Sequence, residues 1–340
     1  MKSLILALAV FAALAAPARA QSDADTPYVV LVTIDGYRWE DLFRGADPSL
    51  LTDDRYRARY VDVPDRAQAL TPFLLGFAQE GALIGNRDQN SCARVTNDYW
   101  FSYPGYTEML AGRPNPAIRS NAPVPNDDVT VLERLARRPD YAGQVRVFAE
   151  WDVVPAILNT ERSGIPVFNP PDPAALHDPQ VIPAARAVLS DPPRMLWVAL
   201  GDTDNRAHEG DYERYLAAAT DADNFVREIW EAYQANPRTA GRTILIVTAD
   251  HGRGGAENGR WHGHGSGQWR GMYVPGVRRE GSDAVFAAVR GPGVRAAPGY
   301  TMEHCATLSQ IGATILRAAG VLDEEGEASM AAPLDVFGER

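Results

Sequence analysis

Aspartate and histidine residues recur where apolar runs of this chain end. Three such segments carry them: Val30–Gly36 (VLVTIDG), Trp197–His208 (WVALGDTDNRAH) and Ile244–Gly252 (ILIVTADHG). Each apolar run is typical of a buried parallel strand, and ligands collect at the carboxyl ends of such strands. We therefore expect one site to gather these side chains: Asp35, Asp204, His208, Asp250 and His251.

A further histidine, His264 in the segment WHGHG, completes a set of three carboxylates and three imidazoles. Imidazole selects zinc-like metals, while carboxylates supply negative charge and oxygen ligands. Asp204 and His208 are four residues apart, so a helix would place both on one face, where they can hold one ion. Each Asp-His pair alone is more often a turn or a helix cap. Their joint occurrence predicts two divalent ions, with zinc favoured.

A candidate nucleophile lies in the segment DYWFSYPGYTEMLAGRP, residues 98–114. Pro104 suits the first turn of a helix, which places Ser102 at the helix N-terminus. Free backbone N–H groups and the helix dipole favour a phosphoryl oxyanion there, and a nearby metal would stabilise the serine alkoxide without a histidine base. The alternative is that Ser102 is only an N-cap, and this segment alone favours that alternative.

Strand-like apolar runs alternate with helix-length segments along the chain. The predicted strands are Val29–Thr33, Ala82–Ile84, Val145–Phe148, Met195–Leu200, Thr243–Thr248 and Ala284–Val289. The predicted helices are Val129–Ala136 (with Asn126 and Asp127 as cap options), Tyr212–Ala235, and Thr307–Ala319, which ends at Gly320. This alternation predicts an α/β fold with a mainly parallel central sheet and helices on both faces.

Pro- and Gly-rich stretches interrupt these elements at Arg113–Pro125, Gly164–Pro173 and Gly252–Gly281. We interpret them as loops over the carboxyl edge of the sheet, because predicted strands continue on either side. The roughly 320 residues from 21 to 340 are consequently expected to form a single catalytic domain with loop insertions.

The N-terminus predicts export. Residues 1–20 combine a lysine at position 2, an apolar stretch and the small-x-small sequence Ala18-Arg19-Ala20, the pattern of a cleaved signal peptide. The apolar stretch is shorter than the about 20 residues of a spanning helix, so no membrane anchor is expected after cleavage. The sequence therefore predicts a periplasmic or secreted protein. The net charge of −11 argues against a nucleic-acid-binding face and leaves small phosphorylated substrates open, because bound metals reverse the local field.

The chain has two cysteines, Cys92 and Cys305. In an oxidising compartment they form one bridge or remain two buried thiols, and the sequence leaves both possibilities open. The sequence does not define an oligomeric state.

The order Asp35, Ser102, Asp204-x3-His208, Asp250-His251, His264 resembles the alkaline phosphatase superfamily of two-metal hydrolases. The pattern is most similar to the nucleotide pyrophosphatase/phosphodiesterase-like branch, whose nucleophilic Thr or Ser stands two residues before a proline, as Ser102 does. Thr107 lacks such a proline and would lie inside the helix.

This resemblance implies a ligand set and a mechanism. One ion would be held by Asp35, Ser102, Asp250 and His251, and the other by Asp204, His208 and His264. Ser102 would attack phosphorus in line, giving a phosphoserine intermediate that water then hydrolyses. Asn121 resembles the family asparagine that hydrogen-bonds a phosphate oxygen; the alternative for it is a turn residue.

Several neighbouring residues compete for these roles. His262 also falls in the WHGHG segment, but His264 precedes a glycine as the family histidine does. Asp202 stands six residues before His208, which would put the two side chains on opposite faces of a helix. His304, beside Cys305, is interpreted as a packing or surface residue.

Other functions fit less well. A sulfatase needs Cys or Ser in Cys/Ser-x-Pro-x-Arg, and position 106 is tyrosine. The Asp-Ser-Ala nucleophile segment of the alkaline phosphatases is not evident, nor is the glycine-rich motif of a Rossmann domain. A phosphoglycerate mutase would need a large insertion between Ser102 and Asp204. The remaining alternatives are a sulfuric ester hydrolase and a non-catalytic exported pseudoenzyme that binds metal or a phosphorylated ligand. We expect a metal-dependent hydrolase of phosphate monoesters or diesters.

Overall fold

The computed structural model describes residues 26–170, 177–267, 278–297, 299–321 and 329–338. The predicted signal peptide, residues 1–20, lies outside the described residues, as do parts of two predicted loops, 164–173 and 252–281.

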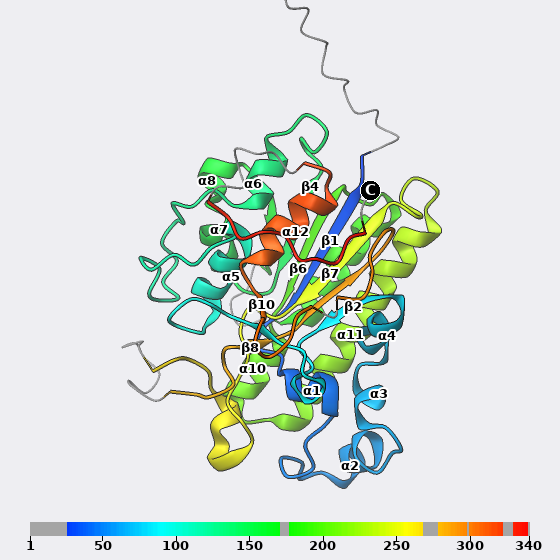
Figure 1. The fold of residues 1–340 in the computed structure, drawn as a ribbon, viewed down its shortest axis with the longest axis vertical. Coiled ribbons are helices and arrows are strands. Elements are labelled where there is room, and N and C mark those ends of the chain that lie inside the picture. Colours follow the sequence, from blue (N-terminus) through cyan, green and yellow to red (C-terminus); the bar gives the residue numbers. More distant parts are fainter. Residues whose placement is uncertain (1–25, 171–176, 268–277, 298, 322–328, 339–340) are drawn as a thin grey trace, which may run out of the picture.

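A seven-stranded sheet forms the centre of the molecule, in the order β2-β9-β7-β1-β6-β4-β5 (Figure 1). Five neighbouring strands run parallel, β9 pairs antiparallel with β7, and the edge strand β2 pairs antiparallel with β9. The strand bounds are β1 Tyr28–Ile34, β2 Gly81–Ile84, β4 Val145–Ala149, β5 Val167–Phe168, β6 Met195–Leu200, β7 Thr243–Thr248 and β9 Ala287–Arg290. The predicted α/β fold with a mainly parallel sheet is confirmed.

The register of the three central strands brings their carboxyl ends to one level. Every residue of β1, β6 and β7 is buried, as expected for apolar strands covered on both faces. Ile34 pairs with Leu200, and Thr33 pairs with Thr248. The residues that follow these strands therefore leave the sheet side by side at the same edge.

Helices cover the sheet in two groups. The first group consists of three helices that pack against one another: α5 (Ser102–Ala111), α6 (Val131–Ala136) and α12 (Gln310–Ala318). Helix α12 lies in front of the sheet in Figure 1. In the second group α4 (Pro72–Glu80) and α9 (Asp178–Ala187) each pack on α11 (Tyr212–Ala235), which lies behind the sheet. Among the described residues, we find no helix long and apolar enough to cross a membrane.

Shorter helices occupy the connections between these elements. They are α1 (Trp39–Arg44), α2 (Asp54–Tyr60), α3 (Arg66–Leu70), α7 (Val154–Ile157), α8 (Thr160–Ser163) and α10 (Asp202–Glu209), with 3₁₀ turns η1 (Arg87–Gln89), η3 (Val188–Ser190) and η4 (Glu257–His262). Of these, α10 directly follows β6 at the carboxyl edge of the sheet.

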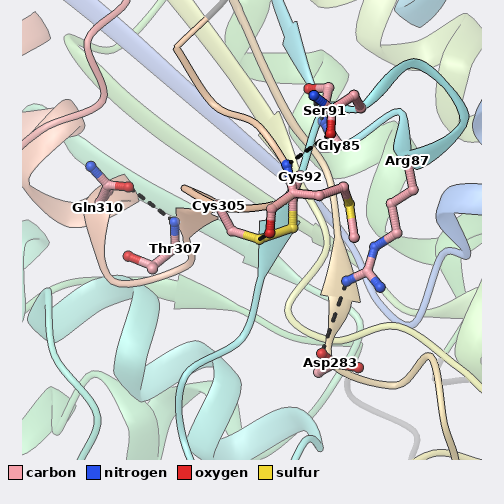
Figure 2. The surroundings of a disulfide bond; sticks show 10 residues. Gly85, Arg87, Ser91, Cys92, Asp283, Cys305, Thr307 and Gln310 are labelled. Carbon is pink, nitrogen blue, oxygen red and sulfur yellow. Dashed lines mark hydrogen bonds and ion pairs between the residues drawn. A yellow bond between two sulfur atoms is a disulfide. The ribbon is translucent and has the colours of Figure 1, made fainter.

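A small sheet of β10 (Ala306–Thr307), β3 (Ala93–Arg94) and β8 (Ala284–Val285) carries a disulfide bond. Cys92 and Cys305 precede two paired strands, and the bond joins them with a Cα–Cα distance of 4.5 Å (Figure 2). The bridge, left open by the sequence, is thus present. The bond closes a loop across a sequence separation of 213 residues and so lowers the conformational entropy of the unfolded chain. In the loop-entropy model this stabilises the folded state by about 5 kcal/mol.

Three element predictions were wrong in detail. The predicted strand Ala284–Val289 is two strands in different sheets, β8 and β9, separated by Phe286. The last helix begins at Gln310, because Thr307 belongs to β10 and its N–H donates to Gln310 Oε1 at 3.0 Å. Helix α6 is capped by Thr130, whose Oγ1 accepts from Glu133 N.

Asn126 and Asp127, the cap options proposed for α6, therefore do not cap it. Asn126 is buried instead, and its Nδ2 donates to the carbonyl of Ile157 at 3.2 Å. It joins the loop before α6 to the end of α7.

Candidate metal centre

The predicted site residues meet at the carboxyl edge of the central sheet. One comes from the end of β1, two from the end of β7, two from α10, one from the first position of α5 and one from the loop after η4. In that order they are Asp35, Asp250, His251, Asp204, His208, Ser102 and His264. Residues as far apart in sequence as Asp35 and His264 thus contribute to one cluster.

The first group of potential metal ligands is Asp35, Asp250 and His251, whose ligand atoms all lie within 4.8 Å of one another. His251 Nε2 is 3.3 Å from Asp35 Oδ1 and 3.5 Å from Asp250 Oδ2. The other ring nitrogen, Nδ1, lies 2.9 Å from the carbonyl of Gly252. A carbonyl only accepts, so Nδ1 carries a proton and donates it, and in the neutral ring Nε2 is left with a free lone pair.

The Ser102 hydroxyl also lies close to His251 Nε2. Its Oγ is 3.3 Å from His251 Nε2, and the side chain is buried at the start of α5. Gly105 allows this approach, because a Cβ at that position would lie 2.4 Å from the carbonyl oxygen of Asp250. The glycine in the sequence SYPGY therefore lets α5 pack directly on the end of β7.

The second group contains Asp204 and His264, which form a ligand cluster with His251. His208 extends it: its Nε2 is 3.1 Å from Asp204 Oδ2 and 3.1 Å from His264 Nε2. Helix α10 presents Asp204 and His208 on one face at the i,i+4 spacing. Gly36, with φ +60°, leaves room for this carboxylate, because a Cβ there would lie 2.7 Å from Asp204 Oδ1.

The pKa values of the three carboxyl groups in the cluster are shifted in different directions. Burial and the Asp204 carboxylate raise the pKa of Asp35, and burial with Asp35 holds the pKa of Asp250 well above its usual range. Burial opposes the charged form of His251, but Asp250 and Asp35 outweigh it and raise the pKa to about 9. Burial also acts against ionised Asp204, yet His208 and Arg253 hold its pKa well below the usual range. Close carboxylates of this kind require a proton or a cation between them.

The residues fit divalent metal ions. Asp35 Oδ1 and Asp250 Oδ2 are buried and have no hydrogen-bond partner among the described residues. A buried polar atom without a partner costs about 1–3 kcal/mol, and more when it is charged. Carboxylate oxygens and imidazole nitrogens are the donor set of zinc-type sites, and a cation placed between them would satisfy both orphaned oxygens.

Asn121 lies beside the candidate nucleophile. Its Oδ1 accepts a hydrogen bond from the backbone N–H of Tyr103 at 3.0 Å, and its side chain lines the same cavity as Ser102. Because Oδ1 is engaged, the amide N–H groups are what Asn121 can offer to a bound oxygen.

The competing residues lie outside the cluster. Asp202 Oδ1 is 2.7 Å from His177 Nδ1, and His262 packs edge-on against Trp261. Thr107 is buried inside α5, where its Oγ1 is 3.5 Å from Asn126 Nδ2. His304 is exposed.

Two residues that sequence reasoning missed contact the predicted ligands. The Tyr106 hydroxyl donates to Asp35 Oδ2 at 3.1 Å. Arg253 is buried, forms an ion pair with Asp204, and donates from Nε to the carbonyl of Trp261 at 2.8 Å. The only sequence signal for Arg253 is its position two residues after His251. Such contacts orient ligand side chains and tune the charge of a metal site.

A cavity of about 450 Å³ opens in front of the cluster. One part of the cavity is lined by the site residues Ser102, Asn121 and Asp204. The rest of its wall includes Glu150, Trp151, Asn205 and Arg279. The cavity lies within the size range of small-molecule sites, so it has room for a small substrate beyond the cluster itself.

Residues 180–321 match the family model of the Metalloenzyme superfamily. This segment contains five of the seven clustered residues: Asp204, His208, Asp250, His251 and His264. No curated protein matches the chain by sequence.

Solved structures of similar fold cover most of the chain. A 2-O GAG sulfatase is similar with a TM-score of 0.58 and 14% identity, over 92% of this chain and 76% of that chain. A phosphonate monoester hydrolase of Agrobacterium radiobacter is similar with a TM-score of 0.52 and 15% identity, over 87% of this chain and 74% of that chain. A protein in the alkaline phosphatase superfamily from Vibrio parahaemolyticus is similar with a TM-score of 0.51 and 13% identity, over 87% of this chain and 67% of that chain.

The family model matches residues 180–321, and the fold of the chain is similar to that of a protein in the alkaline phosphatase superfamily. The fold expected from the resemblance to the alkaline phosphatase superfamily is thereby confirmed, and the comparisons single out no branch of it.

Proposed function

We propose that this protein is a two-metal hydrolase of phosphate esters that acts through a phosphoserine at Ser102. The observation that carries the proposal is the convergence of Ser102 Oγ, Asp35 Oδ1 and Asp250 Oδ2 within 3.5 Å of one nitrogen, His251 Nε2. A nucleophile and anionic ligands that share one point are what metal-activated displacement requires.

Two ligand sets would hold the ions. Asp35, Asp250 and His251 with Ser102 would hold one, and Asp204, His208 and His264 would hold the other, zinc being favoured by three imidazoles. When bound, the ions would lower the pKa of the serine hydroxyl and neutralise charge on the phosphoryl and leaving oxygens.

The side chains of this chain then perform the displacement. Ser102 Oγ forms a bond to phosphorus as the bond to the ester alcohol breaks, and the alcohol leaves with a proton from solvent. Asn121 would donate an amide N–H to a non-bridging oxygen. Water then attacks phosphorus from the side that the alcohol has left, opposite Ser102 Oγ, and loses a proton to solvent. The P–Oγ bond breaks, the phosphate product is released, and Oγ takes up a proton to restore the hydroxyl.

A serine–histidine–aspartate triad is the competing use of these residues. In a triad the serine and the aspartate bond to opposite nitrogens of the imidazole. Here Ser102 Oγ and the Asp35 and Asp250 carboxylates all approach Nε2, and Nδ1 is taken by the Gly252 carbonyl. That arrangement cannot relay a proton between carboxylate and serine, and it favours metal chemistry.

Sulfate esters are the second substrate class to test. A 2-O GAG sulfatase shares the fold, but Tyr106 stands where the sulfatase motif needs arginine. The tyrosine ring is buried and its hydroxyl bonds to Asp35 Oδ2, so this position contacts a candidate metal ligand instead of supplying the arginine of the motif.

We also propose that the protein acts outside the cytoplasm, in the periplasm or after secretion. Residues 1–20 have the composition of a signal peptide. The Cys92–Cys305 disulfide supports this placement, because such bonds persist in oxidising compartments.

The test uses the mature chain with zinc added. Hydrolysis of p-nitrophenyl phosphate, bis(p-nitrophenyl) phosphate and p-nitrophenyl sulfate is measured for the wild type, Ser102→Ala and the exposed control Ser190→Ala. We expect phosphate ester turnover that Ser102→Ala reduces by about 10³-fold or more and that Ser190→Ala retains. Acid quenching should trap a phosphoserine that mass spectrometry assigns to Ser102.

Turnover of the sulfate alone would replace the proposal with a sulfuric ester hydrolase. Stoichiometric zinc without any Ser102-dependent turnover would make the chain a metal-binding pseudoenzyme.

A further inference from the structure

The acidic residues at the carboxyl edge continue one strand beyond the metal centre. Glu150 directly follows β4, which pairs with β6 in register from Val145 to Ala149, and its N–H donates to the carbonyl of Ala199 at 3.1 Å. The clustered ligands come from the ends of β7, β1 and β6. Glu150 is therefore the next side chain along the edge, and it lines the same cavity.

Glu150 is held firmly in place. Asn169 Nδ2 donates to the carbonyls of Ala149 and Trp151, each at 2.9 Å, which fixes the backbone on both sides of the glutamate. The carboxyl itself receives a hydrogen bond to Oε1 from Asn205 Nδ2 at 2.9 Å. Fixed groups of this kind distinguish a built binding wall from a mobile surface side chain.

One oxygen of this carboxyl has no partner. Glu150 is only 5% exposed, and within the described parts of the chain no hydrogen bond reaches Oε2. The oxygen lies against Gly201, where a Cβ would be 2.1 Å away, so the missing side chain leaves room for it. An unpartnered oxygen in a cavity wall is accessible to a ligand, which can complete its hydrogen bonding.

The surroundings define which ligand suits Glu150. Burial and the neighbouring Asp178 raise the pKa of Glu150 to about 9. The carboxyl accepts hydrogen bonds through its oxygens and, when protonated, also donates one. The Asn205 amide beside it likewise has a donor and an acceptor. A hydroxyl group, which donates and accepts through one atom, matches this pair better than a second anion would, because Asp178 and Asp202 also contribute negative charge here.

Trp151 supplies an apolar surface next to these polar groups. Its ring packs 6.2 Å from the ring of Tyr106 and lines the cavity. Carbon frames that carry hydroxyl groups bind at walls that combine an aromatic face with fixed hydrogen-bonding groups.

We propose that Glu150, Trp151 and Asn205 form a subsite for the alcohol part of the ester and that it selects alcohols carrying free hydroxyl groups. The proposal rests on the proposed function, since it names the substrate class of the same cavity. A site built around a hydroxyl discriminates strongly against the analogue that lacks it, because its buried polar groups are then left unpaired.

The test compares esters that differ only in hydroxyl groups. Phosphate release is measured from glycerol 3-phosphate and propyl phosphate, and p-nitrophenol release from the p-nitrophenyl diesters of glycerol and propan-1-ol. In the ester class that is turned over, we expect kcat/KM to favour the glycerol compound by about tenfold or more, the effect of one good hydrogen bond.

Variants separate the subsite from general damage. Glu150→Leu should reduce the glycerol-to-propyl ratio towards one, Glu150→Gln should restore part of it, and Asn205→Ala should lower it. Glu161→Leu, on the exposed helix α8, is the matched control and should keep the wild-type ratio. Circular dichroism and zinc content establish that each variant is folded and loaded.

The two possible failures can be told apart. Equal kcat/KM for the glycerol and propyl esters in an active wild type would overturn the subsite and leave the hydrolase proposal standing. Zinc-loaded wild type that hydrolyses neither these esters nor the aryl esters would overturn both. A glycerol preference that Glu150→Leu does not change would also overturn the subsite.

Discussion

Two clusters of buried charge in this molecule differ in how their negative charge is balanced. In the candidate metal centre, Asp35 Oδ1 and Asp250 Oδ2 have no hydrogen-bond partner among the described residues. At the start of α1, buried Asp41 receives hydrogen bonds on both oxygens, from the Tyr212 hydroxyl at 2.6 Å and the Tyr215 hydroxyl at 2.9 Å. Its ion pair with buried Arg38, at 3.2 Å, completes what we call the Asp41 cluster.

The difference distinguishes a cluster whose carboxylate oxygens all have partners from one in which two oxygens have none. Both clusters are buried, and burial is the main cause of the raised pKa of Asp41 in one and of Asp250 in the other. The Asp41 cluster contains its own cation, and Arg38 in turn has a raised pKa because Asp41 and Glu40 outweigh its burial. The metal centre holds carboxylates in excess. Orphaned oxygens, rather than buried charge as such, therefore identify the site that needs a ligand.

The largest effect is expected from Asp250→Asn. The amide keeps the size of the side chain and an oxygen for the Gly36 N–H, which now bonds to Oδ1 at 3.2 Å, but it removes the charge. We expect zinc affinity to fall at least about a hundredfold, as for changes around other metal ligands, and esterase activity to fall with it. Metal analysis after dialysis and kcat/KM measure the two. Full zinc content in this variant would exclude Asp250 as a ligand.

Asp41→Asn should have the opposite profile. It leaves the buried Arg38 guanidinium without its counter-charge, which typically costs about 3–5 kcal/mol of unfolding free energy. Zinc content and kcat/KM per folded molecule should stay at wild-type values. Urea unfolding and metal analysis check this contrast. Loss of zinc without loss of stability would show that the two clusters are not separate.

Removal of metal should destabilise the wild type but not Asp250→Asn. An ion that binds only the folded state adds about 4 kcal/mol at a free concentration a thousand times its Kd. Thermal unfolding with and without EDTA, repeated for both proteins, measures the difference. Equal melting temperatures for the wild type in EDTA and in zinc would contradict a metal bound by the orphaned oxygens.

Asp223 offers a smaller effect between these extremes. It is buried on α11 and accepts from the backbone N–H groups of Phe73 and Leu74, and burial raises its pKa to about 6 from 3.8. The folded state therefore holds a proton that the unfolded state releases between about pH 4 and pH 6. Stability falls as the pH rises through that window, by at most about 3 kcal/mol.

Asp223→Asn tests this sign. The amide is neutral at every pH and keeps one acceptor oxygen, so its melting temperature relative to the wild type should rise from pH 4.5 to pH 7. A constant difference would mean that the two backbone donors fully compensate the charge.

The sequence predicted what depends on local apolar runs and their ends. β6 and β7 have the predicted bounds because their six residues are uniformly apolar or β-branched, and α11 has the predicted bounds Tyr212–Ala235. The gathering of Asp35, Asp204 and Asp250 followed from the parallel register, since neighbouring parallel strands end at one edge. Their ligand roles remain predictions.

Features that depend on contacts across long sequence distances were not predictable. The apolar residues 284–289 have no break in hydropathy, so nothing local indicated that β8 and β9 join different sheets. Tyr106 was weighed only as the absence of an arginine, because its bond to Asp35 spans 71 residues. Arg253 in isolation resembles a surface loop residue, and only the folded chain places it on Asp204.

The Cys92–Cys305 disulfide closes a covalent ring that contains most of the candidate site. Ser102, Asn121, Asp204, His208, Asp250, His251 and His264 all lie between Cys92 and Cys305, and Asp35 alone lies outside the ring that the bond closes. A single protease cut in an exposed loop of that ring, such as residues 113–125, leaves both pieces covalently attached. The nicked protein would run as one band on a gel until a reductant separates it into two.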